Sequence, residues 1–244
     1  VQGEHDALEM CQRVAAAVGC PVEQVLVCST GVIGVKLPME KVRAGIDAAV
    51  AALSTDVEAG RAFLSAIMTT DAFPKEAGVR VGDATMAGVC KGAGMIQPDM
   101  ATMLAFVATD VDVGADALRA GMARIADTSF NAVHVDTHTS TNDTFLLLTT
   151  RKVPAPADWE QRLEPVARRL AWLIARDGEG ATKVTTVRVL GASSDAVAKR
   201  IARHVAASAL VRTALFGNDP NWGRFVSQVG NVAEVKAPEK LLCR

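Results

Sequence analysis

The most informative segment of the sequence is Lys91-Gly-Ala-Gly-Met-Ile-Gln-Pro-Asp-Met-Ala-Thr-Met-Leu-Ala-Phe-Val-Ala-Thr-Asp110. Its first part, residues 91–101, holds two glycines and a proline and is therefore expected to be a loop. Its second part, from Thr102 to Ala108, is almost continuously apolar, which is typical of a buried strand. The Thr102 hydroxyl is thus predicted at a loop-to-strand junction, where the backbone can be strained.

Thr102 is a candidate nucleophile. A hydroxyl needs a base, and the free α-amine of the same residue can serve as one after the preceding peptide bond is cut, because that amine titrates near neutral pH. In a precursor, the hydroxyl can attack the Ala101 carbonyl, form an ester by an N-to-O acyl shift and be released by water. A threonine that opens a strand is also an ordinary β-former, so the residue alone leaves both interpretations open.

Self-cleavage also needs a small preceding residue and hydrogen-bond donors for the developing oxyanion. Ala101 is small, and the segment Ser29-Thr30-Gly31-Val32-Ile33-Gly34 predicts a tight turn with outward backbone amides. Thr30 and Gly31 are therefore candidate donors.

The rest of the chain predicts a mixed α/β fold. Helical periodicity or capping residues favour helices over 7–18, with a left-handed cap at Gly19, and over 39–53, 116–126, 157–176 and 194–208. Alternating or apolar runs favour strands over 23–28, 79–90, 145–150 and 183–189, with a turn or bulge inside 79–90.

Composition excludes several classes of protein. The chain has a net charge of −1 and no basic stripe, which argues against nucleic acid as a partner. Its apolar runs are far shorter than the roughly 18 to 20 residues that a membrane span needs.

Five cysteines without a CxxC pair favour thiols in a reducing cytoplasm. His134 and His138 could both bind a metal only within a helix, and their surroundings predict strand and turn, so no metal site is expected.

The segment 91–110 closely resembles the self-processing site of ornithine acetyltransferases, also called glutamate N-acetyltransferases. Five other segments agree in the same order, so the resemblance spans almost the whole chain; they are Cys28–Gly34, Met68–Asp71, Thr139–Thr144, Asp177–Lys183 and Gly217–Arg224.

The resemblance implies a role for particular residues. The bond between Ala101 and Thr102 is expected to be cut, leaving an α-chain part (1–101) and a β-chain part (102–244) in one intertwined fold. Thr102 is expected to accept the acetyl group, with the Thr30 hydroxyl and the Gly31 amide as the oxyanion hole.

Three further side chains are expected to contact the amino-acid substrate together with Thr102: Thr69, Lys91 and Glu179. An ammonium group can pair with the substrate carboxylate, and a carboxylate can hold a substrate ammonium. The neighbouring Thr70 is an alternative to Thr69. Without the resemblance, Lys91 could be a solvated strand end, and Glu179 could belong to a turn that caps a helix.

The resemblance also implies a fold and an activity. The fold is a mixed layered α-β-β-α architecture, helices flanking two stacked sheets, shared with a family of self-processing aminopeptidases. The expected reaction moves acetyl from N2-acetylornithine to glutamate through acetyl-threonine, as a step of arginine biosynthesis in the cytoplasm, with no cofactor. Some similar proteins also use acetyl-CoA, and family members are typically heterotetramers of two α and two β chains.

Two alternatives stay open. The first is a self-processing aminopeptidase or amidohydrolase, in which water resolves the acyl-enzyme. The second is an inactive truncated fragment: family members begin well before Val1 and continue well beyond Arg244, with a C-terminal segment that adds substrate contacts through an Asn and a Ser or Thr.

Overall fold

The computed structural model describes residues 2–97, 103–236 and 242, so Ala101 and Thr102 lie outside the described residues. The α-helices of the described residues are α1 Gln2–Val18, α2 Met39–Ala51, α3 Val57–Ile67, α4 Ala115–Thr128, α5 Trp159–Arg176, α6 Asp195–Ala207, α7 Ala209–Phe216 and α8 Trp222–Gly230. Their strands are β1 Lys75–Val81, β2 Ala84–Lys91, β3 Leu104–Asp112 and β4 Thr144–Pro154, and two short 3-10 helices are η1 Val22–Gln24 and η2 Phe130–Ala132.

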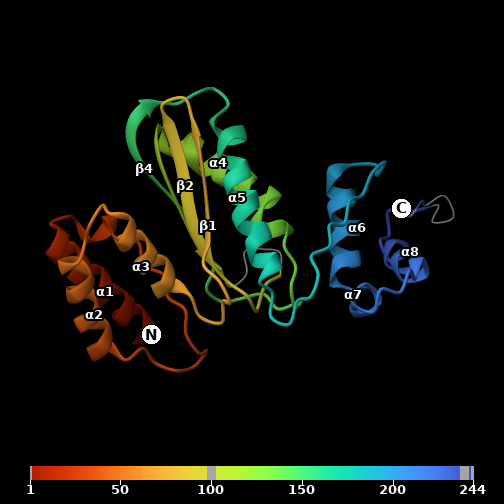
Figure 1. Cartoon of the computed structure of the whole chain (residues 1–244), viewed down its shortest axis with the longest axis horizontal. Coiled ribbons are helices and arrows are strands. Elements are labelled where there is room, and N and C mark those ends of the chain that lie inside the picture. Colours follow the sequence, from red (N-terminus) through yellow and green to blue (C-terminus); the bar gives the residue numbers. More distant parts are fainter. Residues whose placement is uncertain (1, 98–102, 237–241, 243–244) are drawn as a thin grey trace.

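The four strands form one sheet in the order β1-β2-β3-β4 (Figure 1). A two-residue turn joins β1 to β2, and its first position is Gly82 at φ +61°, as a type II′ hairpin requires. β2 pairs antiparallel with β3, and β4 pairs parallel with β3. The parallel pairing needs a long crossover, which α4 supplies. β3 is therefore an inner strand with a neighbour on each edge.

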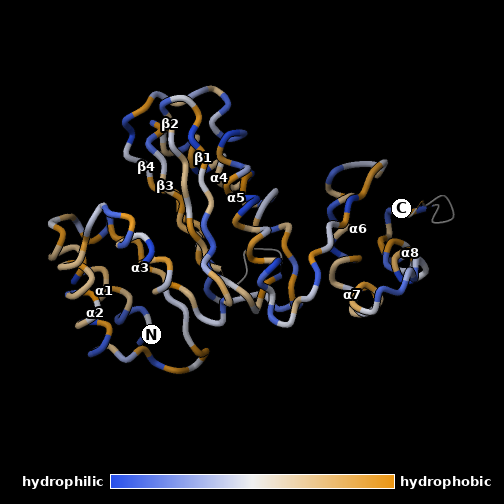
Figure 2. The backbone as a smooth tube through the Cα atoms, viewed as in Figure 1, coloured by the Kyte–Doolittle hydropathy of each residue, from blue (hydrophilic) through white to orange (hydrophobic). Residues whose placement is uncertain are grey.

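α4 and α5 pack on one face of this sheet and enclose the main core (Figure 1). The apolar stripe of α5 includes Leu163 and Leu170, both at most 1% exposed, and it meets the inward side chain of Val107 on β3. β3 is hydrophobic along the middle of the sheet (Figure 2). Burying such side chains contributes about 1.5 to 3 kcal/mol each, so this face anchors the strand that Thr102 precedes.

The first three helices lie together beside the sheet (Figure 1). Two ion pairs join α1 to α2, Arg13 with Asp47 and Arg43 with Glu9. α3 reaches the sheet on the face opposite α5, where the ring of Phe63 meets that of Phe106 edge-on at 5.3 Å.

The last three helices have a core of their own, built around Val197, Ile201 and Val211. The Lys183 ammonium donates hydrogen bonds to the Leu215 and Phe216 carbonyls and so satisfies the C-terminal end of α7. This contact ties the segment after α5 to the C-terminal helices.

The mixed α/β class is confirmed, and so are all five expected helices. Gly19 at φ +75° caps α1, and the expected strand over 79–90 is the β1–β2 hairpin with its turn at Gly82. The expected strands over 102–108 and 145–150 are β3 and β4, with β3 described from Leu104. Within the described ranges the strands pair into one sheet; a second sheet is not among them.

Two expected strands are wrong. Residues 23–28 begin in the 3-10 helix η1 and form no ladder, and residues 183–189 form none either. The alternating valines of the second segment instead place Val187 and Val189 against the core of the C-terminal helices. An alternating pattern indicates which side chains are buried. It does not by itself make a strand, because a strand also needs a neighbouring backbone to pair with.

Candidate active site

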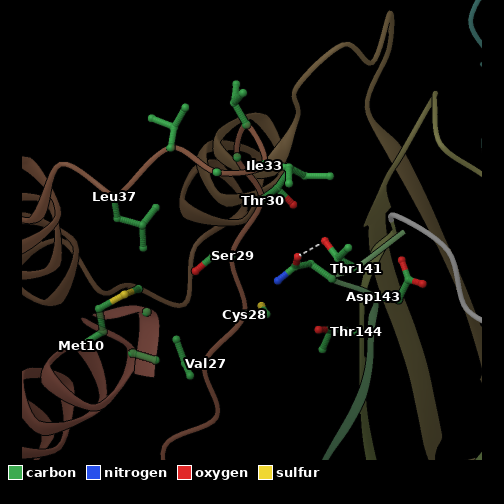
Figure 3. A pocket seen from close by; sticks show the side chains of 17 residues that line it. Met10, Val27, Cys28, Ser29, Thr30, Ile33, Leu37, Thr141, Asp143 and Thr144 are labelled. Atoms are coloured by element: carbon green, nitrogen blue, oxygen red, sulfur yellow. Dashed lines mark hydrogen bonds between the residues drawn. The ribbon is translucent and has the colours of Figure 1, made fainter. Parts of the chain in front are cut away.

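The segment that carries Thr30 and Gly31 borders a cavity of about 530 Å³ (Figure 3). One wall is the segment from Val27 to Val35 with Leu37, a second is α1 through Met10, and a third is the segment from Thr141 to Thr144 that leads into β4. The cavity is thus built from three segments that are far apart in the sequence.

A tight turn follows Thr30 and Gly31 in the wall of the cavity. The Val35 amide donates to the Val32 carbonyl at 3.1 Å, and Gly34 at φ +82° takes the position that a type II turn reserves for glycine. Thr30 and Gly31 precede this turn and are exposed. Among the described residues, neither the Thr30 hydroxyl nor the Gly31 amide has a hydrogen-bond partner, so both can serve a ligand.

The wall opposite is tied to the start of β3. The Met103 amide donates to the Asp143 carboxylate at 3.1 Å, and the Thr144 amide donates to the Met103 carbonyl at 3.0 Å. Two residues that line the cavity therefore hold the residue that directly follows Thr102 in the chain. Thr102 itself and Ala101 lie outside the described residues, and their roles stay predictions.

Lys91 ends β2 directly opposite Leu104 and is 1% exposed. Burial lowers the pKa of its ammonium, while the charges of Asp71 and Asp143 act in the opposite direction. Burial also raises the pKa of Asp143 to about 6, against the Met103 hydrogen bond and the charge of Lys91. A buried cation and a carboxylate of perturbed pKa thus lie beside the start of β3, an arrangement frequent at functional sites.

Thr69 lies in the exposed segment between α3 and β1. Its amide donates to the Asp71 carboxylate at 3.0 Å, and the same carboxylate accepts the Gly92 amide at 2.8 Å. Thr69 is thereby placed near the end of β2, next to Lys91. Thr70 is equally exposed, so the choice between the two threonines stays a prediction.

Glu179 follows α5 and returns to the same loop. Its amide donates to the Ala93 carbonyl at 2.8 Å, and its carboxylate lies against the α-carbon side of Gly94. The structure therefore gathers Thr69, Lys91 and Glu179 around residues 91–94.

The sequence analysis did not assign a function to four charged residues of this region. Asp71 and Asp177 both bind the ammonium of Lys75, which is fully buried, and Asp143 lines the cavity. The available signal was the polar density of the segments that contain Asp71, Asp143 and Asp177. In the described part of the chain, no cluster of three His, Cys, Asp or Glu side chains is arranged to hold a metal ion, and no helix is long and apolar enough to cross a membrane.

Comparison with known proteins identifies the family of the chain. The family model of the ArgJ family matches residues 1–243. The chain belongs to the ArgJ family. Among its ArgJ relatives, the arginine biosynthesis bifunctional protein of Geobacter sulfurreducens is 50% identical over 94% of this chain, and that of Thermus thermophilus is 48% identical over the same share.

The chain spans about 60% of the length of these two ArgJ proteins. The crystal structure of the ArgJ protein from Bacillus halodurans is also similar, with 37% identity and a TM-score of 0.52 over 54% of this chain and 66% of that one. The ArgJ fold is therefore shared by the matched parts.

Proposed function

We propose that the chain carries the self-cleaving acyl-transfer site of an enzyme that moves acetyl from N2-acetylornithine to glutamate, giving ornithine and N-acetylglutamate in arginine biosynthesis. One observation carries the proposal: Thr30 and Gly31, whose donors have no hydrogen-bond partner among the described residues, line a cavity whose opposite wall is hydrogen-bonded to Met103. A nucleophile at the neighbouring Thr102 would have donors for an oxyanion within the same cavity.

The first step is the cleavage itself. The Thr102 hydroxyl attacks the Ala101 carbonyl carbon, the carbon–nitrogen bond breaks, and an ester forms as the nitrogen takes the hydroxyl proton. Water then hydrolyses the ester, which frees the Thr102 α-amine and the Ala101 carboxylate. The products are the α-chain part, 1–101, and the β-chain part, 102–244.

Transfer uses the freed groups. The α-amine of Thr102 takes the hydroxyl proton while the oxygen attacks the acetyl carbonyl of acetylornithine, and ornithine leaves with that proton. The Thr30 hydroxyl and the Gly31 amide stabilise the oxyanion. The glutamate amine then attacks the acetyl ester and regenerates the hydroxyl.

Charge complementarity supports the two amino acids as substrates. The buried ammonium of Lys91 suits the α-carboxylate that both share, and the exposed carboxylate of Glu179 suits an ammonium group of ornithine. Thr69, which lies near Lys91, supplies a hydroxyl for a further hydrogen bond to the substrate. Acetyl-CoA as a further acyl donor, a tetramer of two α and two β chains, and a cytoplasmic location belong to the same proposal.

Intact mass spectrometry tests the cleavage. The wild-type chain should give two species that divide between Ala101 and Thr102, and Thr102→Ala should stay uncut. Thr150→Ala, an exposed threonine of β4, is the matched control and should be cut normally. Cleavage at another bond, or normal cleavage of Thr102→Ala, would contradict the assignment of the nucleophile.

Substrate addition tests the transfer. Acetylornithine should add about 42 Da, the mass of an acetyl group, to the species that begins with Thr102. N-acetylglutamate should appear when glutamate is then added. Release of acetate without glutamate would instead identify a hydrolase, and a cut chain that takes up no acetyl would identify an inactive fragment.

A further inference from the structure

A buried cluster of three charged residues, Asp71, Lys75 and Asp177, contacts the segments that carry the proposed substrate residues. The Lys75 ammonium is fully buried and lies 2.5 Å from a carboxylate oxygen of Asp71 and 2.5 Å from one of Asp177. The side chain of Asp71 is also fully buried, and that of Asp177 is 4% exposed. The three residues come from the turn after α3, the start of β1 and the end of α5.

The cluster holds backbone as well as side chains. Asp71 accepts the Thr69 amide with one oxygen and the Gly92 amide with the other, and Asp177 accepts the Ala72 amide at 3.0 Å. Three segments are thus fixed to one another: the turn that carries Thr69, the strand end that carries Lys91, and the helix end two residues before Glu179.

Charge balance links Lys91 to this cluster. Two carboxylates and one ammonium leave this cluster with a net charge of −1, and the buried ammonium of Lys91 interacts with Asp71 of the cluster and with Asp143 outside it. Among the described residues no hydrogen bond engages the Lys91 ammonium. The donors of Lys91 are therefore unused within the described residues, and the charges of Asp71 and Asp143 favour its charged form.

Stability alone does not account for the cluster. Taking charges out of water costs free energy, and well-packed apolar side chains of similar volume stabilise a fold as well or better. Apolar side chains could not accept the hydrogen bonds of three backbone amides, and they could not hold two buried ammonium groups in fixed positions.

We propose that Asp71, linked to Asp177 through the Lys75 ammonium that both bind, is a positioning residue. It holds Thr69, Lys91 and Glu179 in fixed relative positions for the carboxylate and ammonium groups of an amino-acid substrate. The inference rests on the proposed function for the identity of that substrate. It assigns no bond-making role to Asp71.

The kinetic test replaces Asp71 with Asn, which keeps the shape and one acceptor but removes the charge. KM for acetylornithine should rise at least tenfold, with a smaller change in kcat and with cleavage before Thr102 still complete. Val111→Ala, a fully buried residue near the far end of β3, controls for lost stability, and Asp127→Asn breaks an exposed ion pair with Lys199. Both controls should keep the wild-type KM. An Asp71→Asn enzyme with an unchanged KM would overturn the inference.

Hydrogen exchange followed by mass spectrometry gives a second readout that needs no activity. In Asp71→Asn, exchange should rise together in peptides that cover 68–74 and 91–97, whereas Val111→Ala should raise it elsewhere in the sheet. A uniform rise, or none, would overturn the inference. If the wild-type protein transfers no acetyl, the proposed function fails while the exchange pattern still decides the role of Asp71.

Discussion

The carboxyl carbon of Glu179 lies 2.7 Å from the point where a Cβ atom would stand on Gly94. Real Cβ atoms do not approach carboxylates so closely, so the place of this carboxylate depends on a glycine in the loop that precedes Thr102. The two residues are far apart in sequence, and the hydrogen bond that the Glu179 amide donates to the Ala93 carbonyl brings them together.

Replacing Gly94 with Ala should displace the Glu179 carboxylate. We expect KM for acetylornithine to rise by about tenfold, a loss of about 1.4 kcal/mol in binding, because Glu179 is proposed to pair with a substrate ammonium. Steady-state kinetics measures the change. Gly45→Ala is the matched control, since that helical glycine of α2 has open space around it and should leave KM unchanged.

Replacing Thr30 with Ala should lower kcat by about 10² to 10³, the usual effect of losing one oxyanion donor. Thr30→Ser keeps the hydroxyl and should retain most of the rate. Because Thr30 is exposed and has no hydrogen-bond partner among the described residues, thermal unfolding should not change. Equal rates for the Ala and Ser variants would remove Thr30 from the oxyanion hole.

Replacing Asp143 with Asn should change how stability depends on pH. The fold raises the pKa of Asp143 from 3.8 to about 6 through burial, so the folded state binds a proton that the unfolded state has lost between these values. This group therefore weakens the fold progressively as pH rises through that window. Urea unfolding at several pH values should show that the free energy of unfolding of the variant, relative to that of the wild type, increases from about pH 4 to 6 and stays constant above. A difference that stays constant with pH would contradict the raised pKa.

Replacing Gly121 with Ala should destabilise the fold without affecting the site. A Cβ atom there would meet the Trp159 ring at 2.4 Å, inside the core between α4 and α5. Overpacking of this kind costs about 1 to 3 kcal/mol, which chemical denaturation can measure. Gly60→Ala, in a helix with open space at that position, should be neutral or stabilising.

The elements best predicted from sequence are those whose own buried face leaves a clear pattern of apolar residues. The helix α5 has a wide apolar stripe and a stop at Asp177, and β3 is an apolar run after a glycine-rich loop, so both were predicted correctly. Residues 183–189 show the limit: alternating valines were predicted to form a strand, and the fold uses them to cover helices.

The candidate site was predictable in part. The resemblance named Thr69, Lys91 and Glu179, and the structure gathers them around one loop. The Lys75 cluster was not predictable, because a lysine in an alternating strand looks solvent-facing until the register is known. Its partner Asp177 is 102 residues away, and a helix-capping position explained that residue equally well in isolation.

The inner place of β3 has a consequence for assembly. Cutting the chain before Thr102 would leave β2 and β3 paired along their length but joined by no peptide bond. In an uncut chain this pairing forms within one molecule, so refolding is first order. After cleavage the two pieces must meet by diffusion. Refolding from the fully denatured state is then second order and fails on dilution. Cleavage before Thr102 would therefore make folding irreversible: the polypeptide would fold once as a single chain and then persist because its unfolding is slow.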